Sequence, residues 1–151
     1  MLFVITSDSH GRNDTLKAIA SRYPQADLFL DAGDSECRED EILPFLSVRG
    51  NRDYLIENRY RIEEMNGCRI FLYHGDRSIL SKEFLCSVAR NNNCQIIIHG
   101  HTHVPFYTCY QGIHILNPGS VTFPRSRQGA TYALLTIDEA GVKVEFQKVD
   151  S

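Results

Sequence analysis

The chain has 151 residues, of which 42% are hydrophobic and 23% are charged, so we expect one globular domain spanning residues 1–151. The net charge of −3 argues against stable binding of duplex nucleic acid through a basic face. No segment approaches the roughly 18 apolar residues of a membrane span, so no membrane association is expected. Five cysteines, an odd number without a C-x-x-C pair, are expected to be free, small and buried.

The first third of the chain alternates short apolar strands with one helix. Residues 2–6, 27–31 and 45–50 are apolar runs typical of buried strands. Because residues 2–6 begin the chain without a basic segment before them, we expect a first strand, not a signal peptide, and a cytoplasmic protein. Asn13 is the expected cap of a helix that ends at Pro24. The apolar face of this helix follows the i, i+3, i+4, i+7 spacing: Leu16, Ile19, Ala20 and Tyr23.

A hairpin and a second helix follow. Residues 59–75 contain Asn66-Gly67 between two alternating segments, which predicts a hairpin with a type I′ turn. Residues 81–92 have helical periodicity, with Ser81 as the expected cap. The inward face of this second helix is expected to carry four residues: Phe84, Leu85, Val88 and Ala89.

The rest of the chain is expected to be strands. The clearest are residues 94–100, 112–117, 131–138 and 142–149, with the last two joined by Glu139-Ala140-Gly141. Strands alternating with helices at the front and hairpins at the back indicate an α/β fold with mixed sheets.

Five of the predicted apolar strands are followed directly by a loop that carries Asp, Asn or His. These loops read Asp8-Ser9-His10, Gly33-Asp34, Gly50-Asn51-Arg52-Asp53, His74-Gly75-Asp76 and His99-Gly100-His101-Thr102-His103. Each loop alone is equally compatible with an ordinary turn or a structural histidine. Ligand sites in open α/β sheets gather outside the carboxyl ends of the strands, so we expect the five loops to converge. Their carboxylate, amide and imidazole groups suit a divalent ion such as Mn²⁺, Fe²⁺, Zn²⁺ or Ni²⁺.

In this order the loops resemble the motifs of the calcineurin-like metallophosphoesterases: D-x-H, G-D, G-N-x-D/E, a lone H and G-H-x-H. The resemblance runs from residue 2 to about residue 137. The GHTH motif, the later Asn117-Pro118-Gly119-Ser120 and Pro124-Arg125 are similar to the small YfcE-type phosphodiesterase branch. The resemblance implies a four-layer α-β-β-α sandwich, with two mixed sheets face to face and a metal site at the carboxyl ends of strands.

The resemblance also assigns metal ligands by position. Asp8, His10 and His103 would hold one ion, and Asn51, His74 and His101 would hold a second. Asp34 would bridge the two. The implied metals are two divalent ions, manganese first, with Fe, Zn, Ni or Co as the others.

The implied reaction is hydrolysis of a small phosphodiester or other phosphate ester, in which an ion pair activates a water or hydroxide that attacks phosphorus. Asp34, Asn51 and His74 would take part in catalysis. Asp53 resembles the family's outer acidic residue, which orients a neighbour. Arg52 stands where related phosphatases carry a proton-donating histidine, so it is expected either to hold a phosphate oxygen or to be a solvated side chain.

The three histidines after residue 98 are not equivalent. Residues i and i+2 of an extended segment point to the same side, so His101 and His103 can face one site together. His99 has no counterpart in the family motifs and is expected to play a supporting role. His114, in the middle of a predicted strand, is expected to be structural.

Two other functions share these residues. The same fold is a non-catalytic scaffold in the retromer sorting subunit, which has lost metal ligands, and a phosphomonoesterase would use the same site. All seven ligand-type residues have the expected identity here, which favours the enzyme. The chain could also form a homodimer or a higher homo-oligomer.

Overall fold

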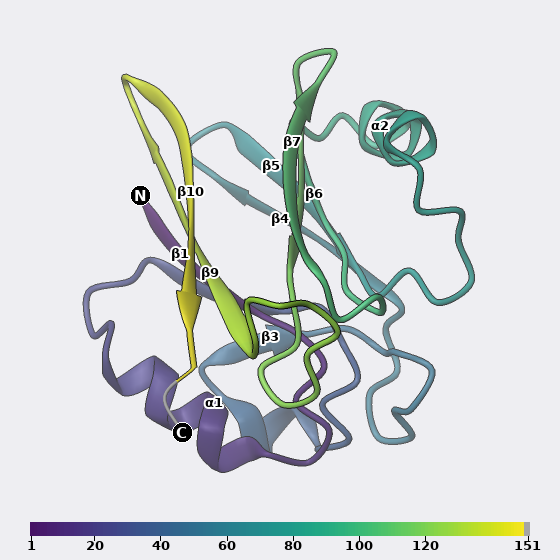
Figure 1. The fold of residues 1–151 in the computed structure, drawn as a ribbon. Helices are drawn as coiled ribbons and strands as arrows, with labels where there is room; N and C mark the ends of the chain where they lie inside the picture. Colours follow the sequence, from purple (N-terminus) through teal and green to yellow (C-terminus); the bar gives the residue numbers. More distant parts are fainter. Residues whose placement is uncertain (150–151) are drawn as a thin grey trace.

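The first of two five-stranded sheets contains both the first and the last strand of the structure (Figure 1). The computed structural model describes residues 1–149. The strand order in this sheet is β10-β9-β1-β2-β3, with β1, β2 and β3 parallel and β9 and β10 antiparallel. The strands are β1 (Leu2–Thr6), β2 (Leu28–Asp31), β3 (Phe45–Ser47), β9 (Thr131–Asp138) and β10 (Gly141–Lys148).

The second sheet is formed by the middle of the chain. The strand order is β4-β5-β6-β8-β7, with β5, β6 and β8 parallel and one antiparallel strand at each edge. The strands are β4 (Tyr60–Met65), β5 (Cys68–Tyr73), β6 (Ile96–Ile98), β7 (Pro105–Tyr110) and β8 (Ile113–Pro118).

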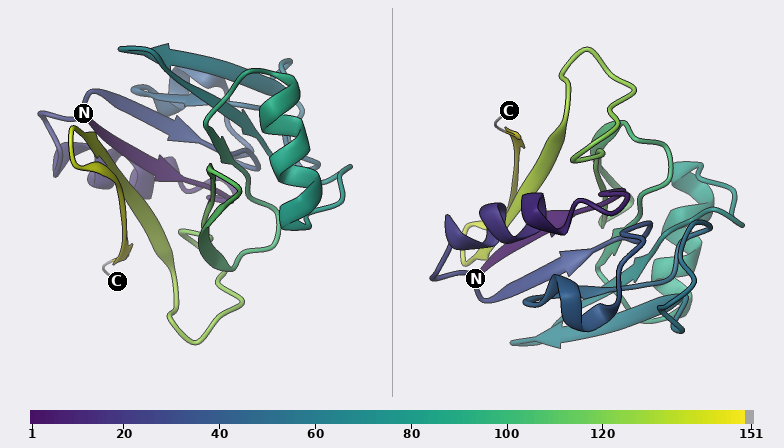
Figure 2. Two further views of the ribbon diagram at one scale, coloured as in Figure 1. Left: turned by 90° about the horizontal axis from the view of Figure 1, so that it is seen from above. Right: turned by 90° about the horizontal axis from the view of Figure 1, so that it is seen from below.

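The helices lie outside the sheets, which gives the four predicted layers (Figure 2). α1 (Asn13–Ser21) packs on the first sheet and α2 (Lys82–Asn91) on the second. A short 3₁₀ helix (Glu39–Ile42) precedes β3. Neither α-helix of the described chain is long and apolar enough to cross a membrane.

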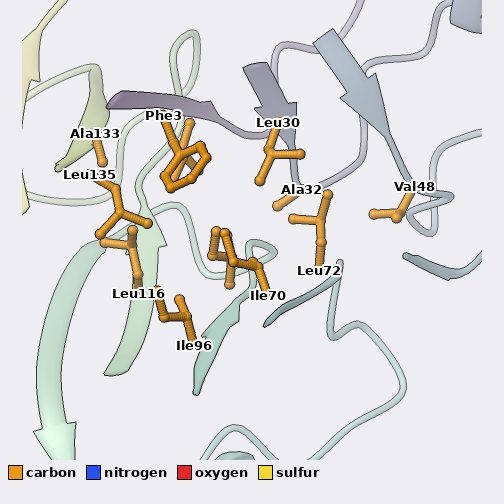
Figure 3. Close-up of a cluster of buried hydrophobic side chains, with 12 residues drawn as sticks. Phe3, Leu30, Ala32, Val48, Ile70, Leu72, Ile96, Leu116, Ala133 and Leu135 are labelled. Atoms are coloured by element: carbon orange, nitrogen blue, oxygen red, sulfur yellow. The ribbon is translucent and has the colours of Figure 1, made fainter. Parts of the chain in front are cut away.

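The main core fills the space between the two sheets (Figure 3). In β1, Phe3 and Ile5 point into this core, while Val4 points to the other face and packs near α1. This alternation follows the two-residue repeat of a strand. Ile70 and Leu72 of β5 meet the first sheet from the opposite side. The expected face-to-face sandwich is therefore confirmed.

Several local predictions are confirmed. Asn66 and Gly67 have φ angles of 51° and 81°, as a type I′ turn requires. The Ser81 hydroxyl caps α2 by accepting the N–H of Phe84. Two predicted strands, over 45–50 and 94–100, are shorter in the structure. They end at Ser47 and Ile98 because the chain leaves the sheet there to form loops.

Other local predictions are wrong. Asn13 does not cap α1; it is the first helical residue, and Arg12 precedes it without a side-chain cap. Phe84 is 39% exposed, and Cys86 takes the buried place on α2. The helix is rotated slightly from the predicted orientation, so its first turn faces solvent. All five cysteines are free, but Cys109 is exposed because it lies on the edge strand β7.

Candidate metal centre

Five parallel strands bring the predicted loops to one edge of the molecule. β1, β2 and β3 of the first sheet and β5 and β6 of the second are each followed by one loop. In the first sheet, the N–H of Asp8 donates to the Gly33 carbonyl at 2.9 Å; in the second, Gly100 donates to the His74 carbonyl at 3.1 Å. The two groups of loops meet where His74 Nδ1 lies 2.8 Å from the Ala32 carbonyl.

The backbone of these loops adopts a conformation that L-residues seldom use. Five of the seven predicted ligands have φ between 47° and 71°: Asp8, His10, Asp34, His101 and His103. Such conformations cost about 1–3 kcal/mol each and cluster at functional sites. They also correct the expectation that His101 and His103 face one side of an extended segment. The segment bends at both residues, and the two rings reach different neighbours.

Two glycines of the motifs are needed for close approach. A Cβ on Gly50 would lie 2.2 Å from Asp34 Oδ1, and a Cβ on Gly100 would lie 2.1 Å from the Ser7 hydroxyl oxygen. A larger residue at position 50 would displace the Asp34 carboxylate, and one at position 100 would displace the Ser7 side chain. The glycines therefore allow the loops to pack against the aspartates that they surround.

Asp8 lies at the middle of the centre. Its side chain is fully buried, and its Oδ1 lies 3.3 Å from Nε2 of His103, 3.8 Å from Nε2 of His74 and 3.9 Å from Nε2 of His10. The other oxygen, Oδ2, accepts the Ser7 hydroxyl at 2.6 Å. Asp8, His10 and His103 thus form one compact group of potential ligands.

The tautomers of two of these histidines follow from their outer nitrogens. His74 Nδ1 donates to the Ala32 carbonyl, and His103 Nδ1 donates to the Phe123 carbonyl at 2.6 Å. In the neutral rings, Nε2 therefore carries a lone pair directed at the centre. Asp8 Oδ1 is itself an acceptor, and it has no hydrogen-bond partner although it is buried. Converging lone pairs around a buried, unpartnered carboxylate oxygen fit a cation.

The second group surrounds His74. Its Nε2 lies 3.2 Å from Asp34 Oδ2 and 3.1 Å from Asn51 Oδ1, and its ring meets that of His101 edge to face at 5.2 Å. All seven residues predicted as metal ligands are therefore brought together. None of their donor atoms is a thiolate, in line with the hard or borderline ions expected.

Charge coupling within this group is strong. Burial disfavours the charged form of His74, but Asp34 and Asp8 raise its pKa to about 9. Burial likewise opposes ionisation of Asp34, but the hydrogen bond and charge of His74 lower its pKa below the usual value. An environment that retains a proton so firmly also favours a divalent cation, for the same electrostatic reason.

Asp8 and Asp34 differ in the groups of potential ligands that they contact. Asp8 belongs to both groups, because its carboxylate lies close to His103 and His74 alike. Asp34 lies in the His74 group, and its Oδ1 accepts the backbone N–H of Arg52 at 2.8 Å. The bridging role of Asp34 stays a prediction, and the geometry adds Asp8 as a carboxylate within reach of both groups.

Asp53 connects the loops. Its Oδ2 accepts the N–H groups of Asp34 at 2.9 Å and Gly50 at 2.8 Å, and its Oδ1 accepts that of Glu36 at 2.8 Å. Burial raises the pKa of Asp53, although these three donors act in the opposite direction. All three of these hydrogen-bond donors are backbone N–H groups, so the position of Asp53 suits an orienting role.

A cleft of about 600 Å³ opens over the centre. Arg52 and Arg125 line it together with the predicted ligands His10, Asn51 and several neighbours. Arg52 is exposed, and its side chain has no hydrogen bond or ion pair among the described residues. A guanidinium in this position can contact an anion that sits over the centre.

Sequence reasoning missed Glu36, whose Oε2 lies 3.1 Å from His10 Nδ1. The sequence places Glu36 two residues after Gly33-Asp34, and this position could have indicated that it lies near the centre.

His99 is buried beside Gly100, and burial lowers its pKa to about 4. His114 contacts the Tyr107 hydroxyl at 2.8 Å, away from the centre. The supporting role of His99 and the structural role of His114 stay predictions.

Comparisons with known proteins agree with this geometry. Residues 1–140 match the profile of a family described as the calcineurin-like phosphoesterase superfamily domain. The "Probable metallophosphoesterase YsnB" of Bacillus subtilis is 33% identical, over 97% of this chain and 90% of that protein. "Phosphodiesterase YfcE" of Escherichia coli K12 is 34% identical over 74 residues, which are 49% of this chain and 38% of that protein.

Solved structures show the same fold. A Streptococcus pneumoniae protein described as a predicted phosphoesterase has a TM-score of 0.91 at 30% identity, covering 99% of this chain and 90% of that chain. The zinc complex of Vps29 from Entamoeba histolytica has a TM-score of 0.74 at 22% identity, covering 99% and 100% of the two chains. At that identity the second likeness concerns the fold alone.

Proposed function

This chain belongs to the calcineurin-like phosphoesterase superfamily, and on that basis we propose that it is a binuclear metal-dependent phosphodiesterase. The observation that carries the proposal is the buried Asp8 Oδ1, which has no hydrogen-bond partner and faces three imidazole nitrogens. A buried carboxylate oxygen that faces several imidazole nitrogens is a typical position for a bound cation.

The residues of the chain have distinct parts in this proposal. Asp8, His10 and His103 would hold one divalent ion, and Asn51, His74 and His101 the other, with Asp34 shared between them. When bound, the two ions would supply an activated water and neutralise charge on the phosphoryl oxygens. Manganese is the first metal to test, and Fe, Zn, Ni and Co are the others.

The outer residues would hold the ligands and the substrate. Asp53 keeps Asp34 and Gly50 in place through its two carboxylate oxygens. Arg52 and Arg125 line the cleft and would contact phosphate oxygens. The cleft is large enough for a small phosphate that carries substituents on both sides. A diester is favoured over a monoester because the relative YfcE is named a phosphodiesterase.

Metal content and hydrolysis together test the function. The protein is analysed for bound metal and then assayed with Mn²⁺ on bis(4-nitrophenyl) phosphate and on 4-nitrophenyl phosphate. We expect two ions per chain and faster hydrolysis of the diester. Asp34→Asn should lose one ion or both and at least about a hundredfold in kcat/KM, more than is typical for loss of an outer residue.

Asp40→Asn is the matched control, because Asp40 is an exposed aspartate paired with Arg38 at 3.1 Å, outside the centre. It should retain both metal and activity. Absence of metal and of turnover with Mn²⁺, Fe²⁺, Zn²⁺, Ni²⁺ and Co²⁺ would favour the scaffold. Equal or faster hydrolysis of the monoester would favour a phosphomonoesterase.

Arg52 is tested separately. If its guanidinium holds a phosphate oxygen, Arg52→Ala should lower kcat/KM for the diester about tenfold, the usual size of a hydrogen bond to a charged group. The number of bound ions should not change, because only the backbone N–H of Arg52 contacts Asp34. An unchanged kcat/KM would remove Arg52 from the substrate site.

A further inference from the structure

The three histidines around Asp8 Oδ1 differ in the acceptors that face their outer nitrogens. Nδ1 of His74 and Nδ1 of His103 each face a backbone carbonyl. Nδ1 of His10 instead lies 3.1 Å from Oε2 of Glu36. Of these three rings, His10 is therefore the one whose outer partner is a side-chain carboxylate.

Backbone contacts at both residues place Glu36 beside the His10 ring. The Glu36 N–H donates to Asp53 Oδ1 at 2.8 Å, and the residue has a φ angle of 57°, a conformation that L-residues seldom adopt. The His10 N–H donates to the Asp34 carbonyl at 2.9 Å, which holds the two loops together. The contact between the carboxylate and the ring therefore follows from the way the loops pack.

The Glu36 carboxylate selects one of the two neutral forms of the His10 ring. An ionised carboxylate can only accept a hydrogen bond, so the proton belongs on Nδ1, and Nε2 is left with a lone pair. That Nε2 is directed at the centre, 3.4 Å from Nε2 of His103. It is therefore free to bind a cation.

His103 is the competing acceptor for the His10 proton. Its Nδ1 donates to a carbonyl, so its Nε2 could accept from His10 Nε2. The contact with Glu36 is shorter, 3.1 Å against 3.4 Å, and hydrogen bonds to an ionised acceptor are about twice as strong as those between neutral groups. Asp8 Oδ1, at 3.9 Å from His10 Nε2, lies beyond hydrogen-bond distance. Glu36 should therefore prevail, and without it the Nε2 proton would stand where a cation is expected.

From these contacts we propose that Glu36 is the positioning residue of His10, which it holds with the Nε2 lone pair directed at the ion bound by Asp8, His10 and His103. The proposal rests on the proposed binuclear function and adds to it a residue, outside the seven predicted ligands, that sets the affinity for one of the two ions. Loss of a carboxylate that orients a metal-binding imidazole typically weakens metal binding about 10–100-fold.

A Mn²⁺ titration of the metal-free protein tests the proposal, with the free ion measured by electron paramagnetic resonance. The wild type should bind two ions. Glu36→Ala should weaken the binding of one ion about 10–100-fold and leave that of the other unchanged. Glu36→Gln keeps a neutral acceptor for the Nδ1 proton, so it should restore part of the lost affinity.

Glu39→Ala is the matched control. It also removes one carboxylate, from an exposed residue that is not among those lining the cleft. It should bind both ions as the wild type does. Equal affinities in Glu36→Ala and Glu39→Ala would overturn the proposal. Equal weakening of both ions in Glu36→Ala would also overturn it, because it would indicate a general effect of charge.

Failure of the proposed function has a different signature. If the wild type binds Mn²⁺ but hydrolyses neither ester, the function fails and the titration still decides the role of Glu36. If it binds no Mn²⁺, the form of the His10 ring decides. Nitrogen NMR of the metal-free protein at pH 10, above the His74 pKa of about 9, distinguishes the two neutral forms. We expect the proton on Nδ1 in the wild type and in Glu39→Ala, and on Nε2 in Glu36→Ala. The same form in all three proteins would contradict the proposal.

Discussion

Asp8, in the loop that follows β1, and Asp31, the last residue of β2, are two fully buried aspartates, and their charges are accommodated in different ways. Asp31 ends β2 and is surrounded by donors. Its Oδ2 accepts the Thr6 hydroxyl at 2.7 Å, and its Oδ1 accepts the Gly33 N–H at 3.0 Å and the Ser47 hydroxyl at 3.1 Å. Burial outweighs these bonds and raises the pKa of Asp31 to about 7.

Asp8 has an equally buried side chain but fewer donors. Ser7 and the N–H of His101 donate to Oδ2, at 2.6 Å and 3.2 Å, and Oδ1 receives no hydrogen bond. Ring nitrogens of three histidines surround that oxygen instead. The comparison shows that burial alone does not mark a functional carboxylate. Asp31 is stabilised by hydroxyl groups and a proton, whereas Asp8 is directed at a position suited to a cation.

The largest effect that this comparison predicts is that of Asp8→Asn. We expect the variant to lose bound metal from both groups and to lose about a thousandfold or more in kcat/KM, because metals supply several kcal/mol of transition-state stabilisation. At pH 10, above the His74 pKa of about 9, the metal-free variant should nevertheless be more stable than the metal-free wild type, by about 1 kcal/mol or more. Its amide can donate to a histidine nitrogen that Asp8 Oδ1 can only face as an acceptor. Elemental analysis and urea denaturation in a chelator measure the two effects.

Asp14→Asn controls for the loss of one negative charge, since the Asp14 side chain is 73% exposed on α1. It should change neither metal content nor stability appreciably. A metal-free Asp8→Asn protein that is less stable than the wild type would show that Asp8 is structural, as Asp31 is. The contrast between the two aspartates would then be lost.

The sequence predicted the role of Asp8 but not the environment of Asp31. Asp8 stands in a D-x-H motif, and the order of five such motifs predicted both the sandwich and the residues that the structure brings together. Asp31 was read only as the end of an apolar strand. Its partners Thr6 and Ser47 come from neighbouring strands, so the hydroxyl cluster depends on sheet register, which strand patterns do not specify.

The sequence also did not predict the backbone conformation and contacts of the loops, or the orientation of α2. The left-handed backbone at His101 and His103 arises from tertiary contacts, and the two-residue repeat of a strand gave the wrong reason for their convergence. Glu36 was missed because its contact with His10 joins loops 26 residues apart. The outward position of Phe84 depends on a small rotation of α2. Helical periodicity does not fix such a rotation to within one residue.

The smaller effect is that of Asp31→Asn, which should alter the pH dependence of stability and not the metal content. The unfolded chain releases the Asp31 proton near pH 4, whereas the folded protein keeps it until about pH 7. Asp31 therefore contributes stability that is fully present below about pH 4 and is lost as the pH rises to about 7. The loss is about 4 kcal/mol at most. Asparagine cannot ionise and keeps the shape of the side chain, so this slope should disappear in the variant.

Urea denaturation in a chelator between pH 4.5 and 8 measures the free energy of unfolding of the wild type and of the variant. The contributions of the histidines are common to both proteins and cancel in the difference. Asp27→Asn is the matched control, because Asp27 is exposed directly before β2 and its carboxylate accepts the Leu2 N–H at 2.8 Å. Its slope should match that of the wild type. An Asp31→Asn variant with the wild-type slope would mean that Asp31 is ionised in the folded protein at neutral pH. Asp31→Asn should also keep its bound metal, and loss of metal would place Asp31 with Asp8 among the residues on which the cation depends.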